Sequence, residues 1–322
     1  MNFYRKKIKV IFIFSFTLFY FAWISNCFGS EKYGVAWGSG NYEESNYKIM
    51  SLLQDAGLKW ITVTFRWDEI EKAKGNIDLE YQKTISKIAK EKDIYLVARI
   101  RGTPKWANNG HDPNVPPIDI NDFKIFMEKV ASEFKGNIKY WQIWGEPDIS
   151  KFWKSTPHEY VELLKVGYQV IKTVCNDCKV LSAGLDGNGE KYLKILIDEH
   201  FHEYCDIVAF HPYAPTPEAS LLRAKSFIKI LNSKNINKPV WFTEIGFQTG
   251  GWKKGPGVVP NENVKAEYLK KVFNLLKPYA EKIFWYKAAE RPNMYGLIEI
   301  KNDEIFLTPA YYTLKGLIAS DK

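Results

Sequence analysis

A regular alternation of two kinds of segment constrains the fold more than any other feature. From Tyr33 onward, short runs rich in β-branched and aromatic residues alternate with longer amphipathic stretches over about 290 residues. This alternation is typical of repeated βα units around a parallel sheet. The runs predict eight strands, at Tyr33–Ala36, Trp60–Phe65, Ile94–Ile100, Tyr140–Trp144, Lys179–Ala183, Ile207–Phe210, Val240–Glu244 and Ile283–Tyr286.

Helix signals lie between these runs. Thr156, Pro157 and Glu159 supply an N-cap, a first-turn proline and a capping-box glutamate. The stretches Glu44–Ala56 and Asn261–Leu276 are predicted helices of the same kind. Eight strand and helix repeats predict a single (β/α)8 barrel over residues 30–322. An open doubly wound sheet is disfavoured, because no dinucleotide-type glycine pattern follows the first strand.

Residues 1–29 differ from the rest of the chain. Basic residues between Arg5 and Lys9 precede an apolar run, Val10–Ile24, and small and polar residues follow. This order is typical of an export signal, here with cleavage after Gly29. A lipoprotein signal ending before Cys27 and an uncleaved membrane anchor are the alternatives. The protein is therefore expected to be secreted or periplasmic, or attached to a membrane from outside.

The charge of the chain argues against a nucleic-acid partner. The formal net charge is +8, and the four basic residues of the export signal account for four of these charges, which leaves 8 − 4 = +4. No basic stripe or RNA-binding motif is present, so a nucleic-acid partner is not expected. A monomer is expected.

Three cysteines remain after the proposed cleavage: Cys175, Cys178 and Cys205. Two residues between Cys175 and Cys178 could turn tightly, so an exported protein could form a disulfide there, although the odd count leaves the pairing open. Zinc would need further ligands nearby. No metal and no organic cofactor are expected.

Two of the predicted strands end in a glutamate. Tyr140–Pro147 reads YWQIWGEP and contains Glu146, and Val240–Phe247 reads VWFTEIGF and contains Glu244. A carboxylate inside a core strand would be costly to desolvate, so both residues are predicted at the rim of the barrel. Barrel active sites lie at the C-terminal ends of the strands. Strands four and seven are nearly opposite each other, so the two carboxyl groups should converge, as glycoside cleavage requires.

Several motifs in order carry a resemblance to a known group of enzymes. They are Trp67–Glu71 with Lys74–Asp78, Thr103–Ala107, Trp144–Pro147, His211–Tyr213 and Thr243–Phe247. Together they resemble glycoside hydrolase clan A, nearest to family 39 and similar to families 5 and 42, from about Tyr33 to Gly316. The resemblance implies a retaining double displacement with Glu146 as acid/base and Glu244 as nucleophile, about 5–5.5 Å apart.

The resemblance also implies residues that bind the substrate. Tyr213 and His211 would lie beside the nucleophile, where Tyr213 could bind its carboxylate. Trp285 would form the aromatic floor beneath the cleaved sugar. Trp106 and Trp144 would add stacking surfaces, although packing in the core is the alternative for all these aromatic residues.

Two positions depart from the clan pattern. Gly145 stands where the clan usually has an asparagine that holds the sugar 2-hydroxyl, and it could make room for a C2 substituent such as an acetamido group. Thr62 stands where an arginine is usual on strand two. Substitutes for that arginine could be Arg66, Arg99 or Arg101.

The substrate is expected to be a poly- or oligosaccharide, chosen by the loops Asn108–Pro117 and Gln248–Pro260. The sequence leaves three alternatives open. These are a carbohydrate-binding barrel that has lost turnover, a transglycosylase that uses the same glycosyl-enzyme intermediate, and an inverting enzyme on the same barrel.

Overall fold

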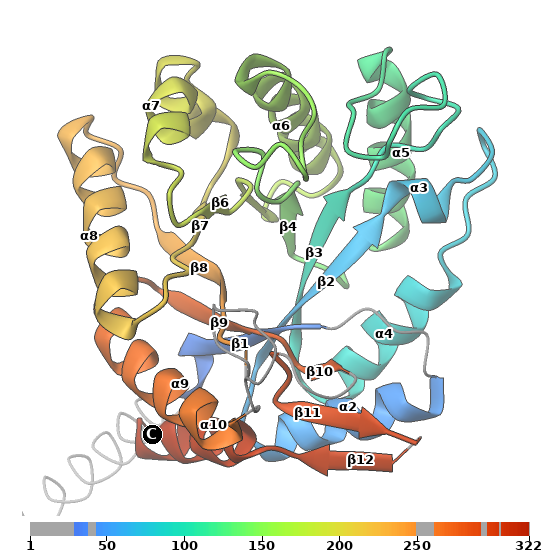
Figure 1. The fold of residues 1–322 in the computed structure, drawn as a ribbon. Helices are drawn as coiled ribbons and strands as arrows, with labels where there is room; N and C mark the ends of the chain where they lie inside the picture. Colours follow the sequence, from blue (N-terminus) through green and yellow to red (C-terminus); the bar gives the residue numbers. More distant parts are fainter. Residues whose placement is uncertain (1–28, 38–42, 249–260, 291–294, 303, 322) are drawn as a thin grey trace, which may run out of the picture.

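The computed structural model describes residues 29–37, 43–248, 261–290, 295–302 and 304–321 (Figure 1). The predicted export signal and residues 249–260 of the second specificity loop lie outside this range. Within the described residues, no helix is both long enough and apolar enough to cross a membrane.

A single parallel sheet of nine strands forms the centre of the fold, in the order β5-β4-β3-β2-β1-β9-β8-β7-β6. The sheet curls on itself, as in an α/β barrel (Figure 1). β5 and β6 are two short pieces of one segment, and a parallel bridge between Leu181 and Ile207 joins the two sides of the sheet there. The strands are β1 Tyr33–Ala36, β2 Trp60–Arg66, β3 Tyr95–Arg101, β4 Tyr140–Ile143, β5 Lys179–Leu181, β6 Leu185–Asp186, β7 Val208–His211, β8 Val240–Ile245 and β9 Lys282–Tyr286.

Helices follow the strands and cover the outer face of the sheet (Figure 1). Their apolar faces pack against the strands in one large buried cluster. The helices are η1 Gly29–Lys32, α2 Glu43–Asp55, α3 Trp67–Ile70, α4 Glu80–Glu91, α5 Ile120–Glu133, α6 Pro157–Val174, α7 Glu190–Asp198, η2 Phe201–Tyr204, α8 Pro217–Ser233, α9 Glu262–Leu276 and α10 Pro309–Ser320.

The predicted helix signals are confirmed. The Thr156 side chain accepts a hydrogen bond from the Glu159 amide, and the Glu159 side chain reaches back to the Thr156 amide, which completes the capping box of α6. Asn261 caps α9 by accepting from the amides of Asn263 and Val264. All eight predicted strands are present, and their ends differ from the prediction by at most two residues.

Aromatic side chains fill the barrel at the N-terminal ends of the strands. Trp60, Trp241 and Phe284 are buried there in a small separate cluster. Gly34 is required beside them, because a Cβ atom at this position would lie 2.5 Å from the Phe284 ring. This end of the barrel is therefore closed, and a ligand has to enter from the C-terminal ends.

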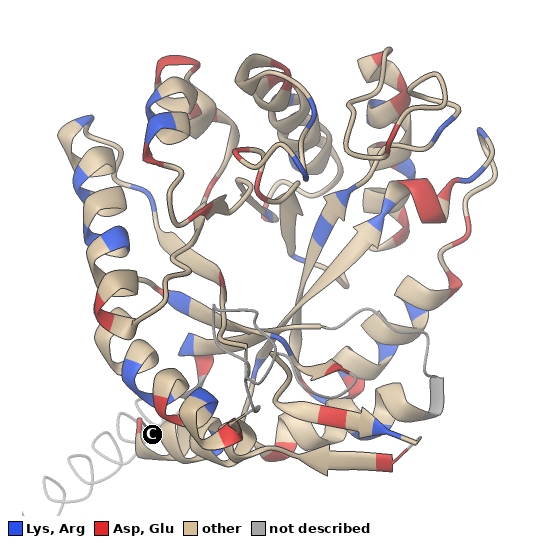
Figure 2. Ribbon diagram, in the orientation of Figure 1, with Lys and Arg blue, Asp and Glu red and all other residues tan. Residues whose placement is uncertain are grey.

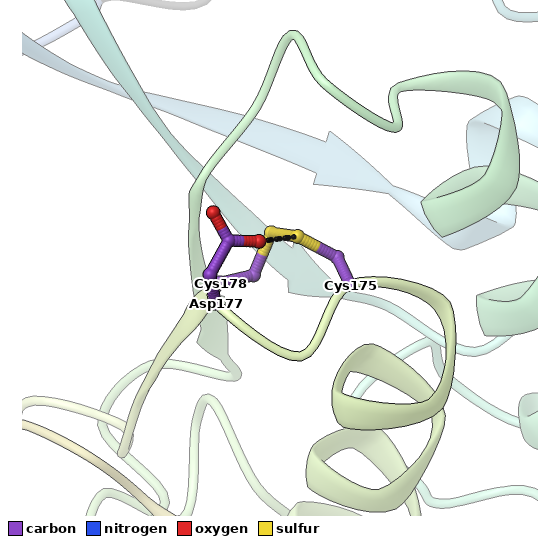
Figure 3. Close-up of side chains that lie close together, drawn as sticks. All are labelled: Cys175, Asp177 and Cys178. Atoms are coloured by element: carbon purple, nitrogen blue, oxygen red, sulfur yellow. Dashed lines mark hydrogen bonds between the residues drawn. A yellow bond between two sulfur atoms is a disulfide. The ribbon is translucent and has the colours of Figure 1, made fainter.

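A small sheet that the sequence did not predict and a disulfide that it left open complete the fold. A small sheet of β10 Ala289–Glu290, β11 Ile298–Lys301 and β12 Glu304–Leu307 follows β9. A disulfide joins Cys175 and Cys178 after α6, with the Asp177 carboxylate beside it (Figure 3). The sequence permitted this pairing and left it open. Cys205 is buried, and burial raises its pKa to about 12, which makes it an unreactive thiol.

Candidate active site

A cavity of about 600 Å³ opens at the C-terminal ends of the strands. Both predicted catalytic residues, Glu146 and Glu244, line it, together with His211 and Gly145. The remaining residues that line it come mainly from the ends of β1, β2, β3 and β9. A cavity of this size can hold part of a saccharide.

Glu146 lies just beyond the end of β4, in a backbone turn that few residues adopt. Its φ is 52° and that of Trp144 is 70°, both in the left-handed region. Such positions carry local strain and cluster at functional sites. The Glu146 amide donates to the carbonyl oxygen of Gly184 at 2.9 Å, which fixes the turn against the neighbouring strand segment. As a result, the Glu146 side chain points into the cavity with 15% of its area exposed.

Glu244 faces the cavity because β8 is irregular. Side chains of a regular strand alternate between the two faces, yet both Thr243 and Glu244 point into the barrel. The register of β8 against β9 shifts between Phe242 and Ile245, as in a β-bulge, and this shift re-aims one side chain. Bulges of this kind are common next to active sites.

Two side chains hold the Glu244 carboxylate. Arg99 donates from Nη1 to Oε1 in a short ion pair, and Tyr213 donates from its hydroxyl to Oε2 at 3.2 Å. Burial by itself would raise the pKa of Glu244, but the Arg99 charge and these two hydrogen bonds hold the pKa below its ordinary value. Glu244 is therefore ionised at neutral pH.

His211 lies between the two carboxylates. Its Nδ1 is 2.8 Å from Glu146 Oε1 and 3.9 Å from Glu244 Oε2. An oxygen of Glu146 and an oxygen of Glu244 lie within 4.8 Å of each other. Gly184 makes room for the imidazole, because a Cβ atom there would lie 2.1 Å from Nε2 of His211.

A chain of hydrogen bonds connects the two carboxylates beneath the cavity. Arg99 donates from Nε to Oε1 of Gln142 at 2.9 Å, so the amide nitrogen of Gln142 is the donor to Thr243 Oγ1 at 3.2 Å. Thr243 Oγ1 lies 3.0 Å from His211 Nε2 and can donate its proton there. His211 then carries its proton on Nδ1 and donates it to Glu146.

The contacts of the two glutamates and His211 favour acid–base chemistry over metal binding. Glu146, His211 and Glu244 have the spacing of a cation site. However, Nδ1 of His211 is used as a donor in the network, and Arg99 already supplies the positive charge at Glu244. The residues therefore suit acid–base chemistry between two carboxyl groups.

The structure corrects the predictions for Trp285 and Trp144. Trp285 is fully buried, does not line the cavity and donates from Nε1 to the carbonyl oxygen of Tyr295. Trp144 is 1% exposed and donates to the carbonyl oxygen of Phe152. Trp106 packs against other side chains outside the cavity, and its Nε1 donates to the Glu71 carbonyl. Neither Trp285 nor Trp144 offers a face to a ligand in this structure, whereas Trp106 is partly exposed, so its role as a stacking surface stays a prediction.

Other aromatic residues occupy the cavity instead. Tyr286 follows Trp285 on β9 and faces inward, on the same side as the buried Phe284. Trp37 follows the neighbouring strand β1, whose Ala36 is in register with Tyr286, and donates from Nε1 to the hydroxyl of Tyr81 at 3.1 Å. Strand alternation from Phe284 could have identified Tyr286. Nothing in the sequence singled out Trp37 and Tyr81.

The contacts of Arg99 concern both positions that depart from the clan pattern. Among the three arginines proposed as substitutes for the one expected at Thr62, Arg99 contacts Glu244. Its side chain also lies over Gly145, where a Cβ atom would be 3.6 Å from Cδ of Arg99. Gly145 also lines the cavity, so the proposed room for a C2 substituent of a sugar stays a prediction.

A partly buried carboxyl group next to the site, that of Asp148, gives a prediction on stability. Burial foremost, with the nearby charges of Asp186 and Glu146, raises the pKa of Asp148 to about 7. Between about pH 4 and pH 7 the unfolded chain releases this proton while the folded chain keeps it, so the free energy of unfolding falls as pH rises. In Asp148→Asn this contribution is absent, so the free energy of unfolding should fall by up to about 4 kcal/mol less than in wild type over the same pH range.

Urea denaturation of both proteins at several pH values between 4 and 8 measures this contribution. We expect the free energy of unfolding of Asp148→Asn, relative to wild type, to increase steadily over this range. Parallel curves for the two proteins would show that Asp148 does not titrate as described.

Comparisons with known proteins give the family and the fold. The family described as glycosyl hydrolase catalytic core matches residues 108–304. No curated protein matches the chain in sequence. A family 39 glycoside hydrolase from the gut symbiont Bacteroides cellulosilyticus WH2 superposes with a TM-score of 0.75 at 20% identity, covering 90% of this chain and 64% of that chain. The chain thus spans less than two thirds of that protein.

Two further structures show the same fold. A monomeric beta-xylosidase from Caulobacter crescentus CB15 has a TM-score of 0.70 at 15% identity, covering 89% of this chain and 68% of that chain. Xylanase B from Clostridium stercorarium F9 has a TM-score of 0.62 at 16% identity, covering 88% of this chain and 96% of that chain. At these identities the likeness is one of fold.

Proposed function

Because the chain belongs to the glycosyl hydrolase catalytic core family, we propose that it is a retaining glycosidase acting on a poly- or oligosaccharide. Glu146 is the acid/base and Glu244 is the nucleophile. The proximity of the two carboxylates supports the proposal, since one oxygen of Glu146 and one oxygen of Glu244 lie within 4.8 Å of each other. Retaining enzymes hold these groups about 5–5.5 Å apart, whereas inverting enzymes leave about 6.5–9.5 Å for a water molecule.

In the first step, Glu146 gives its proton to the glycosidic oxygen while Glu244 attacks the anomeric carbon. The bond to the leaving group breaks, and an ester forms between the sugar and Glu244. The ionised state of Glu244, held by Arg99 and Tyr213, suits this attack. The proton on Nδ1 of His211 orients the Glu146 carboxyl group through Oε1.

In the second step, Glu146 has lost its proton and acts as a base. It takes a proton from a water molecule, whose oxygen attacks the anomeric carbon and releases Glu244. The two displacements restore the original anomeric configuration. A second sugar in place of water would give transglycosylation by the same route.

Arg99 should set the pH dependence of the nucleophile. In Arg99→Gln the buried Glu244 loses its counter-charge, so its pKa should rise and the acidic limb of the kcat/KM profile should move to higher pH. We expect kcat/KM at neutral pH to fall roughly 10²-fold. The matched control is Arg66→Gln, because Arg66 also lines the cavity but pairs with Asp68 and Glu69.

An acidic limb that stays in place in Arg99→Gln would contradict this assignment. The Arg66→Gln profile should keep the wild-type limb. If both variants shift equally, general electrostatics of the cavity rather than the Arg99 contact would explain the result.

Release of reducing ends tests the proposed activity. Purified protein is incubated with xylan, mannan, β-glucan and acidic polysaccharides, and Glu244→Gln serves as the blank. Hydrolysis of at least one substrate by wild type alone is expected. Binding to a saccharide without turnover by wild type would favour the carbohydrate-binding alternative.

We also propose that residues 1–29 direct export. The Cys175–Cys178 disulfide supports this, because such bonds persist in oxidising compartments. Mass spectrometry of the protein purified from its natural host would give the N-terminal residue. A mature chain that begins at Ser30, or at a lipidated Cys27, is expected, whereas an intact N-terminus would support an anchor.

A further inference from the structure

Three arginines at the C-terminal ends of β2 and β3 line the cavity: Arg66, Arg99 and Arg101. Basic residues mark both strand ends (Figure 2). Arg66 pairs with two carboxylates of its own turn, and Arg99 pairs with Glu244. Arg101 differs from both, because no carboxylate of the described residues lies within ion-pair distance of its guanidinium group.

The contacts of Arg101 leave most of its donors unused. Nη2 donates to Oδ1 of Asn114 at 3.1 Å, and the guanidinium carbon lies 5.3 Å from the ring centre of Phe152. The Asn114 amide group in turn donates to Asp112, but Asp112 is already paired with Lys154 at 3.2 Å. In the described part of the chain, neither Nε nor Nη1 of Arg101 has an acceptor, and Nε is buried.

The surroundings of Arg101 disfavour its positive charge. Burial foremost, and then the positive charges of Arg99 and Arg66, lower the pKa of Arg101. The carboxylates of Glu244 and Glu146 act in the opposite direction, but each is paired with another residue, Arg99 and His211 respectively. A second donor, Nη2 of Arg99, is also buried and has no acceptor among the residues that the structure describes. An anion that enters the cavity would give these unused donors an acceptor and would place a negative charge beside the buried Arg101 guanidinium.

We infer that Arg101 recognises an anionic group on the saccharide, on the β3 side of the two catalytic carboxylates. Carboxylate, sulfate and phosphate groups share the required chemistry, because each presents oxygens to the planar donors of a guanidinium. This inference rests on the proposed function, since it names the class of sugar that the same site takes. The substrate is therefore an acidic saccharide.

Binding of small sugars tests the inference without relying on turnover. Glucuronate, galacturonate, glucose 6-sulfate and glucose 6-phosphate are each titrated into the protein by calorimetry at low ionic strength, beside glucose and galactose. Wild type should bind at least one acidic sugar about tenfold more tightly than its neutral counterpart, as a charge-assisted hydrogen bond allows. The best of the four identifies the anionic group.

Variants test whether Arg101 causes the preference for acidic over neutral sugars. Arg101→Gln should reduce it to below about threefold, and Arg101→Lys should restore part of it, because the charge returns without the planar geometry. Arg66→Gln is the matched control and should keep most of the preference, since Arg66 is already paired. Thermal unfolding of each variant shows that the fold is intact.

Three results would overturn the inference. Neutral sugars could bind wild type as tightly as all four acidic sugars, or the preference could survive in a folded Arg101→Gln protein. In both cases, hydrolysis that depends on Glu146 and Glu244 could still stand. Failure of wild type to bind any sugar, together with failure to cleave any polysaccharide, would overturn the proposed function as well.

Discussion

Replacing Glu244 with glutamine is expected to lower kcat/KM by about 10⁴-fold or more, because no glycosyl-enzyme ester can then form. The side chain keeps its size, so Tyr213 and Arg99 lose little packing. Initial rates on the best substrate from the polysaccharide screen, or on an aryl glycoside, measure the loss. The expected deficit lies in kcat, with substrate binding largely kept.

The matched control is Glu80→Gln. Glu80 also lines the cavity, but it is exposed in the first turn of α4 and has no contact with Arg99 or His211. Its replacement should change kcat/KM by less than about threefold. Equal losses in both variants, or full activity in Glu244→Gln, would show that Glu244 is not the nucleophile.

Glu146→Gln should have the second-largest effect, and its size should depend on the leaving group. A general acid contributes about 10²–10⁴-fold when the leaving group needs a proton. Natural saccharides should therefore react about 10²–10⁴-fold more slowly, whereas 2,4-dinitrophenyl glycosides should form the ester at nearly the wild-type rate. Glutamine can still accept the hydrogen bond from Nδ1 of His211, so the site should remain in place.

Pre-steady-state kinetics with both kinds of substrate separate the two steps. In Glu146→Gln, an activated substrate should give a burst of dinitrophenolate followed by slow turnover, because the base for the second step is missing. Added azide, an anion that needs no base, should speed that turnover. An equal loss with good and poor leaving groups would contradict the role of Glu146.

Most of the fold follows from local signals in the sequence. The eight strands are recognisable because parallel strands buried on both faces read as short apolar runs. The cap at Thr156 defines the start of α6, since its side chain satisfies a free backbone amide. The small sheet after β9 was not predicted, because β10 spans only Ala289–Glu290 and carries no clear period.

The aromatic floor shows how a shift of one residue reverses a prediction. Trp285 matched the clan by residue type, but it lies on the outer face of β9, where its ring packs against Phe273 of α9. Tyr286, the next residue, faces the cavity. Alternation along the strand decides between them, because Phe284 and Tyr286 share one face. Position on the pleat was therefore more informative than residue type.

Two features of the site depend on contacts that no local pattern reveals. Glu244 and Thr243 both face inward because of the irregular pairing between β8 and β9, which regular alternation does not predict. Arg99 reaches Glu244 from a strand 145 residues away in sequence. The sequence named it among three candidates, and tertiary packing over Gly145 made the choice. The two glutamates themselves were identifiable, because each ends an apolar run.

The anomeric configuration of the first product tests the central claim most directly. Proton NMR follows the anomeric signals while wild-type protein hydrolyses its best substrate, before mutarotation mixes the two forms. The proposed double displacement predicts that the newly formed reducing end first appears with the configuration of the bond that was cleaved. First appearance of the opposite anomer would contradict the assignment of Glu244 as a nucleophile.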